Sequence, residues 1–454
     1  MLIVEEILKA TKGSLIQGDR SLKTTGLSTD SRRLARGECF LAIEGPRFNG
    51  HDFIDEALKK GASALIVSRK ISMASKVPVI FVKDTTHGLG QIAAVYRQKF
   101  SIPVIAVTGS AGKTTTKEMI GAILSTRWNV LKNVKTENNQ FGVPLTLLRL
   151  NSSHQAAVVE LGTNQKGDIA WLASVCQPTI AVFTNIGESH LEKLKNPLGV
   201  FHEKFSLVKK MDPQGTVIFN RDDPYLQKIF SMKISQKKIS YSIHEKADFQ
   251  AEQIAQDIDQ KIQFAVKKTL FSLNTLAAHN VSNALAAVSC GNLLKIPWPR
   301  MKTALTQFSF CDGRQQIERI GEILLIDDTY NANPVSLRSA IQTLDSLKIR
   351  GKKIMVCADM LELGDQAEDL HRLMGQMIAQ SSVDTVLTFG GLTRHMSQTI
   401  REYNHKEVLQ SESIEELNRH LKNLCRPDDV VLVKGSRAMQ MERVVEFLRK
   451  LFSN

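Results

Sequence analysis

A lysine and a threonine, Lys113 and Thr114, follow a glycine-rich turn in the stretch PVIAVTGSAGKTTTKE, residues 103–118. The apolar run 104–107 has the composition of a buried strand, and the residues after the turn can open a helix. Backbone N–H groups at a helix N-terminus, with the positive end of its dipole, attract an anion. A lysine there reaches the outer phosphates of a nucleotide, and a threonine hydroxyl can ligate Mg²⁺. The stretch therefore predicts a phosphate-binding loop for a nucleoside triphosphate.

The loop is a short variant of the common pattern, because Val107 stands where that pattern has its first glycine. The order of strand, glycines, lysine and threonine favours a nucleotide site over a turn that only caps a helix. The residues expected to bind the nucleotide here are Thr108, Gly109, Ser110, Ala111, Gly112, Lys113, Thr114 and Thr115.

Two further apolar runs end in polar residues followed closely by glycine. The run 156–160 ends in Glu160, and the run 178–185 ends in Asn185. Ligands bind outside the carboxyl ends of the strands in open parallel sheets. The three strand ends therefore predict one crevice, in which Glu160 is a Mg²⁺ ligand beside the phosphate loop.

Other polar residues are ambiguous from their type alone. A lone histidine such as His190 is usually structural, and Lys204 has the surroundings of an exposed helix lysine. The amide-rich loop KTENNQFG fits either turn chemistry or a polar contact to a substrate. His279 and Asn283 stand four residues apart near the start of an expected helix, where they could cap the helix or face a ligand.

The motifs are distributed over an α/β protein of three domains. A length of 454 residues suits about three domains of ordinary size. The expected boundaries are a small α/β domain at 1–84, a central domain with the phosphate loop at 85–311, and a Rossmann-like domain at 312–454. Strands with polar ends recur in the second and third domains, which predicts two parallel sheets that face each other across a substrate cleft.

The composition is that of an ordinary globular protein, with 43% hydrophobic and 23% charged residues. No run approaches the roughly 18 apolar residues of a membrane span, and the N-terminal residues include acids where a signal peptide needs bases. Six cysteines without a CxxC pair predict free thiols rather than disulfides or a zinc site. We expect a cytoplasmic protein that does not insert into membranes.

The formal net charge of +13 suggests an anionic partner or substrate. Nucleic acid is one candidate, but the lysines are spread along the chain, and three Trp and five Tyr offer few rings for base stacking. Anionic small substrates explain the charge at least as well. We therefore expect no nucleic-acid partner.

Eight ordered strings across nearly the whole chain resemble the Mur ligases, ATP-dependent amide-forming enzymes of bacterial peptidoglycan synthesis. They are TGSAGKTTTKE, NNQFGVPLTLL, VVELGTNQKGDI, TNIGESHLE, HNVSNALAA, DDTYNANPVS, DMLELG and KGSRAMQME. Among these, DDTYNANPVS, DMLELG and KGSRAMQME resemble the members that join D-alanyl-D-alanine to UDP-N-acetylmuramoyl-tripeptide. The resemblance implies that ATP phosphorylates the tripeptide carboxylate and that the dipeptide amine attacks the resulting acyl phosphate. It also implies a UDP-sugar domain, an ATPase domain and a C-terminal ligase domain, and monomer is the default state.

The resemblance further implies catalytic roles for particular residues. Lys113 would stabilise the transferred phosphoryl group, and Thr114 and Glu160 would hold one Mg²⁺. His190 would hold a second Mg²⁺, and Lys204 would carry a carbamate. The residues implied for adenine, ribose and the phosphates are Asn185, His279, Asn280, Asn283, Arg314 and Asp328.

Substrate-binding residues follow from the same resemblance. Those implied are Ser31, Arg32, Arg47 and His51 for the UDP group, Asn138 and Asn139 in the amide loop, and Tyr330, Asn331, Asn333, Lys434, Ser436 and Arg437 for the dipeptide. The amide loop is shorter than the family's, so no role is assigned to Thr136.

Three other functions stay open. A sister ligase or a folylpolyglutamate synthase would carry a different sequence in place of DDTYNANPVS. A P-loop NTPase that acts on nucleic acid would show salt-sensitive polynucleotide binding. A regulatory nucleotide-binding module would bind ATP but release no phosphate with any amine. The motifs are compatible with either lysine or diaminopimelate as the third residue of the tripeptide.

Overall fold

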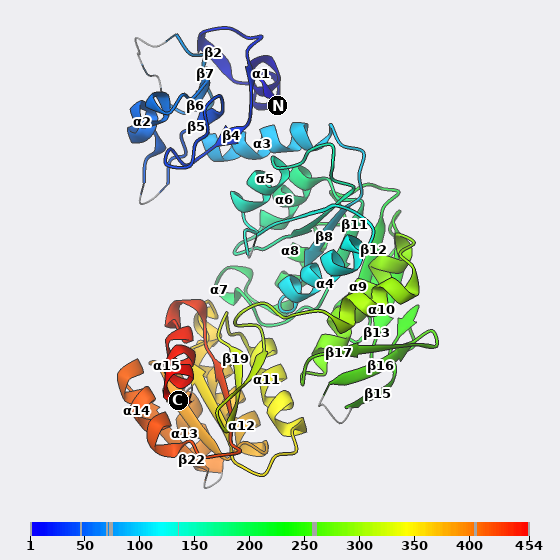
Figure 1. Ribbon diagram of the computed structural model, residues 1–454, viewed down its shortest axis with the longest axis vertical. Helices are drawn as coiled ribbons and strands as arrows, with labels where there is room; N and C mark the ends of the chain where they lie inside the picture. Colours follow the sequence, from blue (N-terminus) through cyan, green and yellow to red (C-terminus); the bar gives the residue numbers. More distant parts are fainter. Residues whose placement is uncertain are drawn as a thin grey trace.

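The structure is a computed structural model that describes residues 2–45, 48–69, 71, 76–134, 136–256, 261–403 and 406–452. Arg47, expected at the UDP side, lies outside the described residues. Figure 1 shows three domains in sequence order, from the blue N-terminal domain to the yellow and red C-terminal one. Among the described residues, no helix is both long and apolar enough to cross a lipid bilayer.

The N-terminal domain is built on a five-stranded sheet. Its order is β2 (Ser14–Gln17), β7 (Val79–Phe81), β6 (Ala64–Val67), β5 (Cys39–Leu41) and β4 (Leu27–Ser28). The helices are α1 (Val4–Thr11) and α2 (Ile54–Lys59), and a small antiparallel pair joins β1 (Leu2–Ile3) to β3 (Lys23–Thr24). The long helix α3 (Thr85–Arg97) then leads into the central domain, and the side chain of Asp84 caps it by accepting the N–H of His87.

The central domain contains a seven-stranded parallel sheet. Its order is β14 (Phe249–Gln250), β13 (Lys237–Ser242), β12 (Thr216–Asn220), β11 (Ile180–Phe183), β8 (Val104–Thr108), β10 (Ala156–Glu160) and β9 (Val130–Lys132). All five residues of β8 are buried, which explains its unbroken apolar sequence, because helices cover both faces of a parallel sheet.

Alternate residues of β8 pack into different cores. Ile105 and Val107 belong to a core with α4 (Lys113–Ser125), α9 (His279–Leu293) and α10 (Trp298–Thr306). Val104 and Ala106 belong to a core on the other face, with α5 (Gly142–Leu147), α6 (Asp168–Cys176) and α8 (Pro197–Phe205). A separate antiparallel sheet follows, made of β15 (Glu252–Gln256), β16 (Ile262–Val266) and β17 (Thr269–Leu273).

The C-terminal domain has a six-stranded sheet. Its order is β18 (Gln316–Ile320), β19 (Ile323–Asp328), β23 (Val430–Lys434), β20 (Lys353–Ala358), β21 (Thr385–Phe389) and β22 (Glu407–Ser411). The helices are α11 (Pro334–Ser346), α12 (Ala367–Gln380), α13 (Thr393–Tyr403), α14 (Ile414–Leu424) and α15 (Glu442–Phe452).

The expectation of a wholly parallel C-terminal sheet is wrong at one edge, where β18 is antiparallel to β19. Ile320 pairs with Ile323, so only two residues form the turn. Gly321 in that turn has φ of 55°, which glycine adopts without steric cost. The rest of the sheet is parallel, so its polar strand ends share one edge.

Candidate active site

The phosphate loop connects the buried strand β8 to helix α4, as the sequence predicts. Two glycines allow its sharp path. Gly109 has φ of 156°, and an added Cβ would lie 1.8 Å from Oγ1 of Thr184. Gly112 has φ of 77°, and an added Cβ would lie 2.5 Å from Oδ1 of Asn283. A larger residue at either position would displace the loop from its neighbours.

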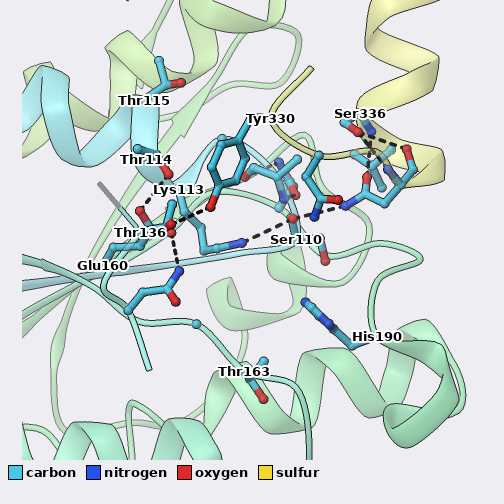
Figure 2. Close-up of a pocket in the computed structure, with 18 of the residues that line it drawn as sticks. Ser110, Lys113, Thr114, Thr115, Thr136, Glu160, Thr163, His190, Tyr330 and Ser336 are labelled. Carbon is cyan, nitrogen blue, oxygen red and sulfur yellow. Dashed lines mark hydrogen bonds between the residues drawn. The ribbon is translucent and has the colours of Figure 1, made fainter. Parts of the chain in front are cut away.

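The loop opens into a cavity of about 1090 Å³, slightly above the roughly 300–1,000 Å³ of ordinary small-molecule sites. Residues 110–115 line it, whereas Thr108 and Gly109 are not among the lining residues. Figure 2 shows Lys113, Thr114 and Glu160 on one side of this pocket and Tyr330 beside them. The central and C-terminal domains both contribute to its walls.

Thr114 and Glu160 form the polar centre of the site. Oγ1 of Thr114 donates to Oε2 of Glu160 over 2.8 Å, and Nδ2 of Asn138 donates to the other carboxylate oxygen over 2.7 Å. Glu160 is only 1% exposed. A hydroxyl and a carboxylate side by side are the hard oxygen donors that Mg²⁺ prefers, so these residues fit the ion that the sequence suggests.

Two lysines stand near this centre, the half-buried Lys113 and the buried Lys204. Lys113 donates from Nζ to the carbonyl of Gly109 over 2.8 Å, and desolvation lowers its pKa. Lys204 is 1% exposed, which differs from the exposed helix lysine that residue type alone suggests. Burial, together with the charge of Lys113, holds the pKa of Lys204 well below its ordinary value. Both effects shift the protonation equilibrium of Lys204 toward its neutral amine.

His190 faces a carboxylate from the other domain, since its Nδ1 lies 2.6 Å from Oε2 of Glu362. This contact lowers the pKa of Glu362. Within the described residues, no group of three or more His, Cys, Asp or Glu side chains could hold a metal ion. A metal ion here would therefore need oxygen ligands from a bound nucleotide as well as from the protein.

The asparagines of helix α9 support the phosphate loop from behind. Nδ2 of Asn283 donates to Oδ1 of Asn280, and Thr116 in α4 donates to Oδ1 of Asn283. Asn185 accepts the N–H of Ala111 on Oδ1 over 2.8 Å. These amides therefore hold the loop in addition to lining the cavity. His279 also lines the cavity, and desolvation lowers its pKa to about 4.

One end of the cavity has residues to which the sequence analysis gave no role. Asp222 lines it, and its carboxylate accepts the backbone N–H groups of Ile243 and His244, which also line the cavity. The signal was present, because TVIFN is another apolar strand that ends in polar residues, NRDDP. The turn-forming residues in that segment hid its position beside the site.

The C-terminal domain reaches the phosphate loop through Arg314 and Tyr330. Arg314 donates from Nη2 to Oγ1 of Thr114 over 3.2 Å, and its guanidinium stacks 3.7 Å from the centre of the Tyr330 ring. The Tyr330 hydroxyl donates to Oγ1 of Thr136 over 2.5 Å. Asn333 donates to the carbonyl of Ser110 over 3.4 Å. Thr136 thus belongs to the site although the sequence assigned it no role.

Asp328 and Lys434 form a buried ion pair of 2.6 Å in the same cavity. The resemblance assigns Asp328 to the ribose and Lys434 to the dipeptide, whereas in the structure the two side chains contact each other. Nζ of Lys434 also donates to the carbonyl of Asn331, which lines the cavity. Ser436 and Arg437 do not line it: Ser436 accepts the N–H of Leu361, and Arg437 pairs with Glu442. Their implied contact with a dipeptide would therefore require a different arrangement of this edge.

The described N-terminal residues implied for the UDP group, Ser31, Arg32 and His51, have their partners within their own domain and do not line the cavity. Ser31 donates to Glu56 over 2.8 Å, and Arg32 pairs with Asp30 over 2.9 Å. Nε2 of His51 accepts the N–H of Ser68. A substrate that contacts both these turns and the phosphate loop must be long.

Three family models match consecutive parts of the chain. The Mur ligase family, catalytic domain, matches residues 23–97, and the Mur ligase middle domain matches residues 107–291. The Mur ligase, glutamate ligase domain, matches residues 313–437.

Curated relatives match over nearly the full length. The UDP-N-acetylmuramoyl-tripeptide–D-alanyl-D-alanine ligase of Bacillus subtilis is 33% identical and covers 98% of this chain and 98% of its own. The enzyme of the same name from Escherichia coli is 35% identical, with 93% of each chain covered.

Solved structures agree with these relatives. A crystal structure of MurF from Acinetobacter baumannii has a TM-score of 0.89 at 32% identity and covers 99% of this chain and 98% of its own. A MurF ligase from Thermotoga maritima in complex with ADP has a TM-score of 0.83 at 29% identity, with coverage of 94% and 98%.

Proposed function

The chain belongs to the Mur ligase family, and we propose that it joins D-alanyl-D-alanine to UDP-N-acetylmuramoyl-tripeptide with the cleavage of ATP to ADP and phosphate. Full-length relatives of that name at 33% and 35% identity support the reaction. The observation that carries it is the single cavity in which Lys113 and Glu160 of one domain face Tyr330 and Lys434 of another. Such a cavity suits a reaction between a phosphorylated acid and an amine.

In the first step, a carboxylate oxygen of the tripeptide attacks the γ-phosphorus of ATP, and ADP leaves. The phosphoryl group carries negative charge throughout the transfer, so the residues that aid it are cations and N–H donors. Lys113 and the backbone N–H groups of the phosphate loop provide these. Arg314 is placed for the same task, because its guanidinium already contacts Thr114. Mg²⁺, held by Thr114 and Glu160, would supply further charge neutralisation when it is bound.

In the second step, the free amine of the dipeptide attacks the carbonyl carbon of the acyl phosphate, an amide bond forms, and phosphate leaves. The attacking nitrogen must also lose one proton before the neutral amide is formed. Catalysis of this step is mainly a matter of holding the two reactants at the reacting distance. We assign this positioning to Tyr330, Asn331 and Asn333, which extend from the C-terminal domain toward the phosphate loop.

We infer that Lys204 reacts with CO₂. Burial next to the charge of Lys113 favours its neutral amine, and only the neutral amine can attack CO₂. When the neutral amine forms the new C–N bond and releases one proton, the uncharged side chain becomes a carbamate anion. This group would offer oxygen atoms to a second Mg²⁺, with His190 as its other protein ligand.

The domain roles follow the same proposal. We assign UDP-sugar binding to residues 1–84, ATP binding to 85–311 and the ligase role to 312–454. The turn with Ser31, Arg32 and His51 would take the UDP group, and Asn138 and Asn139 would contact the peptide. A monomer in the bacterial cytoplasm suits an enzyme whose substrates are small molecules.

Phosphate release from ATP and Mg²⁺ tests the proposal when the assay contains UDP-N-acetylmuramoyl-tripeptide with or without D-alanyl-D-alanine. We expect release that depends on the dipeptide and yields the pentapeptide product. Release with a single amino acid in place of the dipeptide would instead indicate a sister ligase. Release that polynucleotide stimulates, or silence with every amine, would contradict the proposal. Comparing tripeptides with lysine and with diaminopimelate identifies the third residue.

A further inference from the structure

Two loops from different domains meet beside the nucleotide cavity. Residues 184–190 follow β11 in the central domain, and residues 359–366 follow β20 in the C-terminal domain. His190 and Glu362, whose side chains are in contact, both have left-handed backbones, with φ of 55° and 63°. Side chains other than glycine rarely adopt this conformation, and such strain gathers at functional sites. The surrounding structure therefore imposes the position of both residues.

The loop with Glu362 is braced within its own domain. The N–H of Met360 donates to Nε2 of His371 over 3.1 Å, and the His371 ring is fully buried. The N–H of Leu361 donates to Oγ of Ser436 over 2.9 Å. These bonds fix the two residues before Glu362, so the carboxylate moves with the whole domain.

The same loop is docked on the central domain around helix α7 (Leu191–Leu194). Gln366 donates from Nε2 to the carbonyl of Lys195 over 2.8 Å. Gly364 approaches so closely that an added Cβ would lie 2.9 Å from Cα of Glu192. The carboxylate contact is thus one point of a continuous interface and differs from an isolated surface ion pair, which contributes little.

The loop with His190 is in turn hydrogen-bonded to the phosphate loop. Oγ of Ser110 accepts the N–H of Gly187 and the hydroxyl of Ser189, over 3.0 and 2.9 Å. The N–H of Ser110 donates to the carbonyl of Asn185 over 2.9 Å. Figure 2 shows His190 and Ser110 at one side of the pocket. A change at His190 is therefore connected to the phosphate site through a few short hydrogen bonds.

We propose that Glu362 is a positioning residue, which the C-terminal domain supplies to His190 when the two domains dock. The inference rests on the proposed function and adds a residue to it. Nδ1 of His190 lies 2.6 Å from Oε2 of Glu362, although the pair does not have hydrogen-bond geometry, and the His190 ring lines the nucleotide cavity. A carboxylate so close behind a histidine restricts the orientation of its ring. Separation of the domains removes this partner, so phosphoryl transfer is favoured only after docking.

The test compares Glu362→Gln with Glu412→Gln. Glu412 is the matched control, because it is also an exposed carboxylate paired with a basic side chain, that of Arg394, but does not line the nucleotide cavity. Removal of the carboxylate partner of a functional histidine typically lowers activity by about 10- to 100-fold. We therefore expect kcat of Glu362→Gln to fall by about 10-fold or more. The affinity for Mg²⁺-ATP, measured by calorimetry, should change by less than about threefold, because Lys113 and the loop N–H groups are intact. Glu412→Gln should match the unaltered protein in both.

A second readout does not depend on turnover. The fraction of docked molecules is measured by energy transfer between dyes on the central and C-terminal domains, with a non-hydrolysable ATP analogue bound. If Glu362 acts through His190, then Glu362→Gln and His190→Gln each lower this fraction, and the double variant lowers it no further. Additive effects, or a kcat of Glu362→Gln within about twofold of the unaltered protein, would overturn the inference. An unaltered protein that docks in this way but ligates nothing would refute the proposed function alone.

Discussion

Gly187 of the central domain lies next to the phosphate loop and against the C-terminal domain. Its substitution by alanine should oppose the docking of these two domains. An added Cβ would lie 2.1 Å from Cγ2 of Val335, at the start of α11 in the C-terminal domain. The φ of Gly187 is outside the left-handed region, so alanine fits the backbone of the central domain without strain. Gly187→Ala should therefore leave the domain folded and oppose only the docked arrangement.

The size of the effect follows from the clash. Overpacking by one methyl group costs about 1–3 kcal/mol, which corresponds to a roughly 5- to 150-fold change in an equilibrium. We expect kcat/KM for phosphate release to fall within that range. Val335→Ala removes the methyl groups that the new Cβ would meet, so the double variant should regain most of the lost activity.

Steady-state phosphate release is measured for four proteins: the unaltered protein, Gly187→Ala, Val335→Ala and the double variant. Gly391→Ala is the matched control, because an added Cβ there meets nothing within 4 Å. Melting temperatures of all variants verify folding. Activity of Gly187→Ala equal to that of the unaltered protein, or a double variant no better than Gly187→Ala, would refute the reasoning.

Three further predictions concern buried charges. Lys204→Ala should abolish ligation, and added short carboxylic acids should partly restore it; near-normal activity without rescue would exclude the carbamate. Asp328→Asn leaves the buried Lys434 ammonium without its partner, so urea unfolding should show a loss of about 3–5 kcal/mol, whereas a loss under about 1 kcal/mol would mean that water reaches the pair. The pKa of His279 is about 4 in the folded protein, against 6.5 for an ordinary histidine, so the unfolded chain binds more protons between these values and stability should rise with pH across that window. His279→Gln should flatten this rise in pH-dependent unfolding curves, and an unchanged slope would contradict the assignment.

The sequence predicted those parts of the site that are formed by residues close together in the chain. The phosphate loop is a contiguous stretch, and Glu160 ends an apolar run, so local pattern was enough to place both. Residue type alone gave no reason to single out Lys204, because its burial depends on the packing of α8 against the sheet. Two of the charges that act on it, on Lys113 and Glu160, belong to residues distant in the chain.

Contacts between domains could not be derived from local pattern. Tyr330 and Thr136 are 194 residues apart, and no periodicity relates them. Glu362 lies within DMLELG, which the resemblance identified as a motif without giving its glutamate a partner. The edge strand β18 was missed for a different reason: its sequence, QIERI, is mostly polar and has neither an apolar run nor a strict alternation of polar and apolar residues.

The path of oxygen atoms tests the central claim most directly. Both carboxylate oxygens of the tripeptide's reactive group are labelled with ¹⁸O, and the enzyme is supplied with ATP, Mg²⁺ and D-alanyl-D-alanine. If that carboxylate attacks the γ-phosphorus, the bridging oxygen leaves with phosphate, and mass spectrometry should find one ¹⁸O in each phosphate released. Unlabelled phosphate alongside pentapeptide formation would contradict an acyl phosphate and the account built on it.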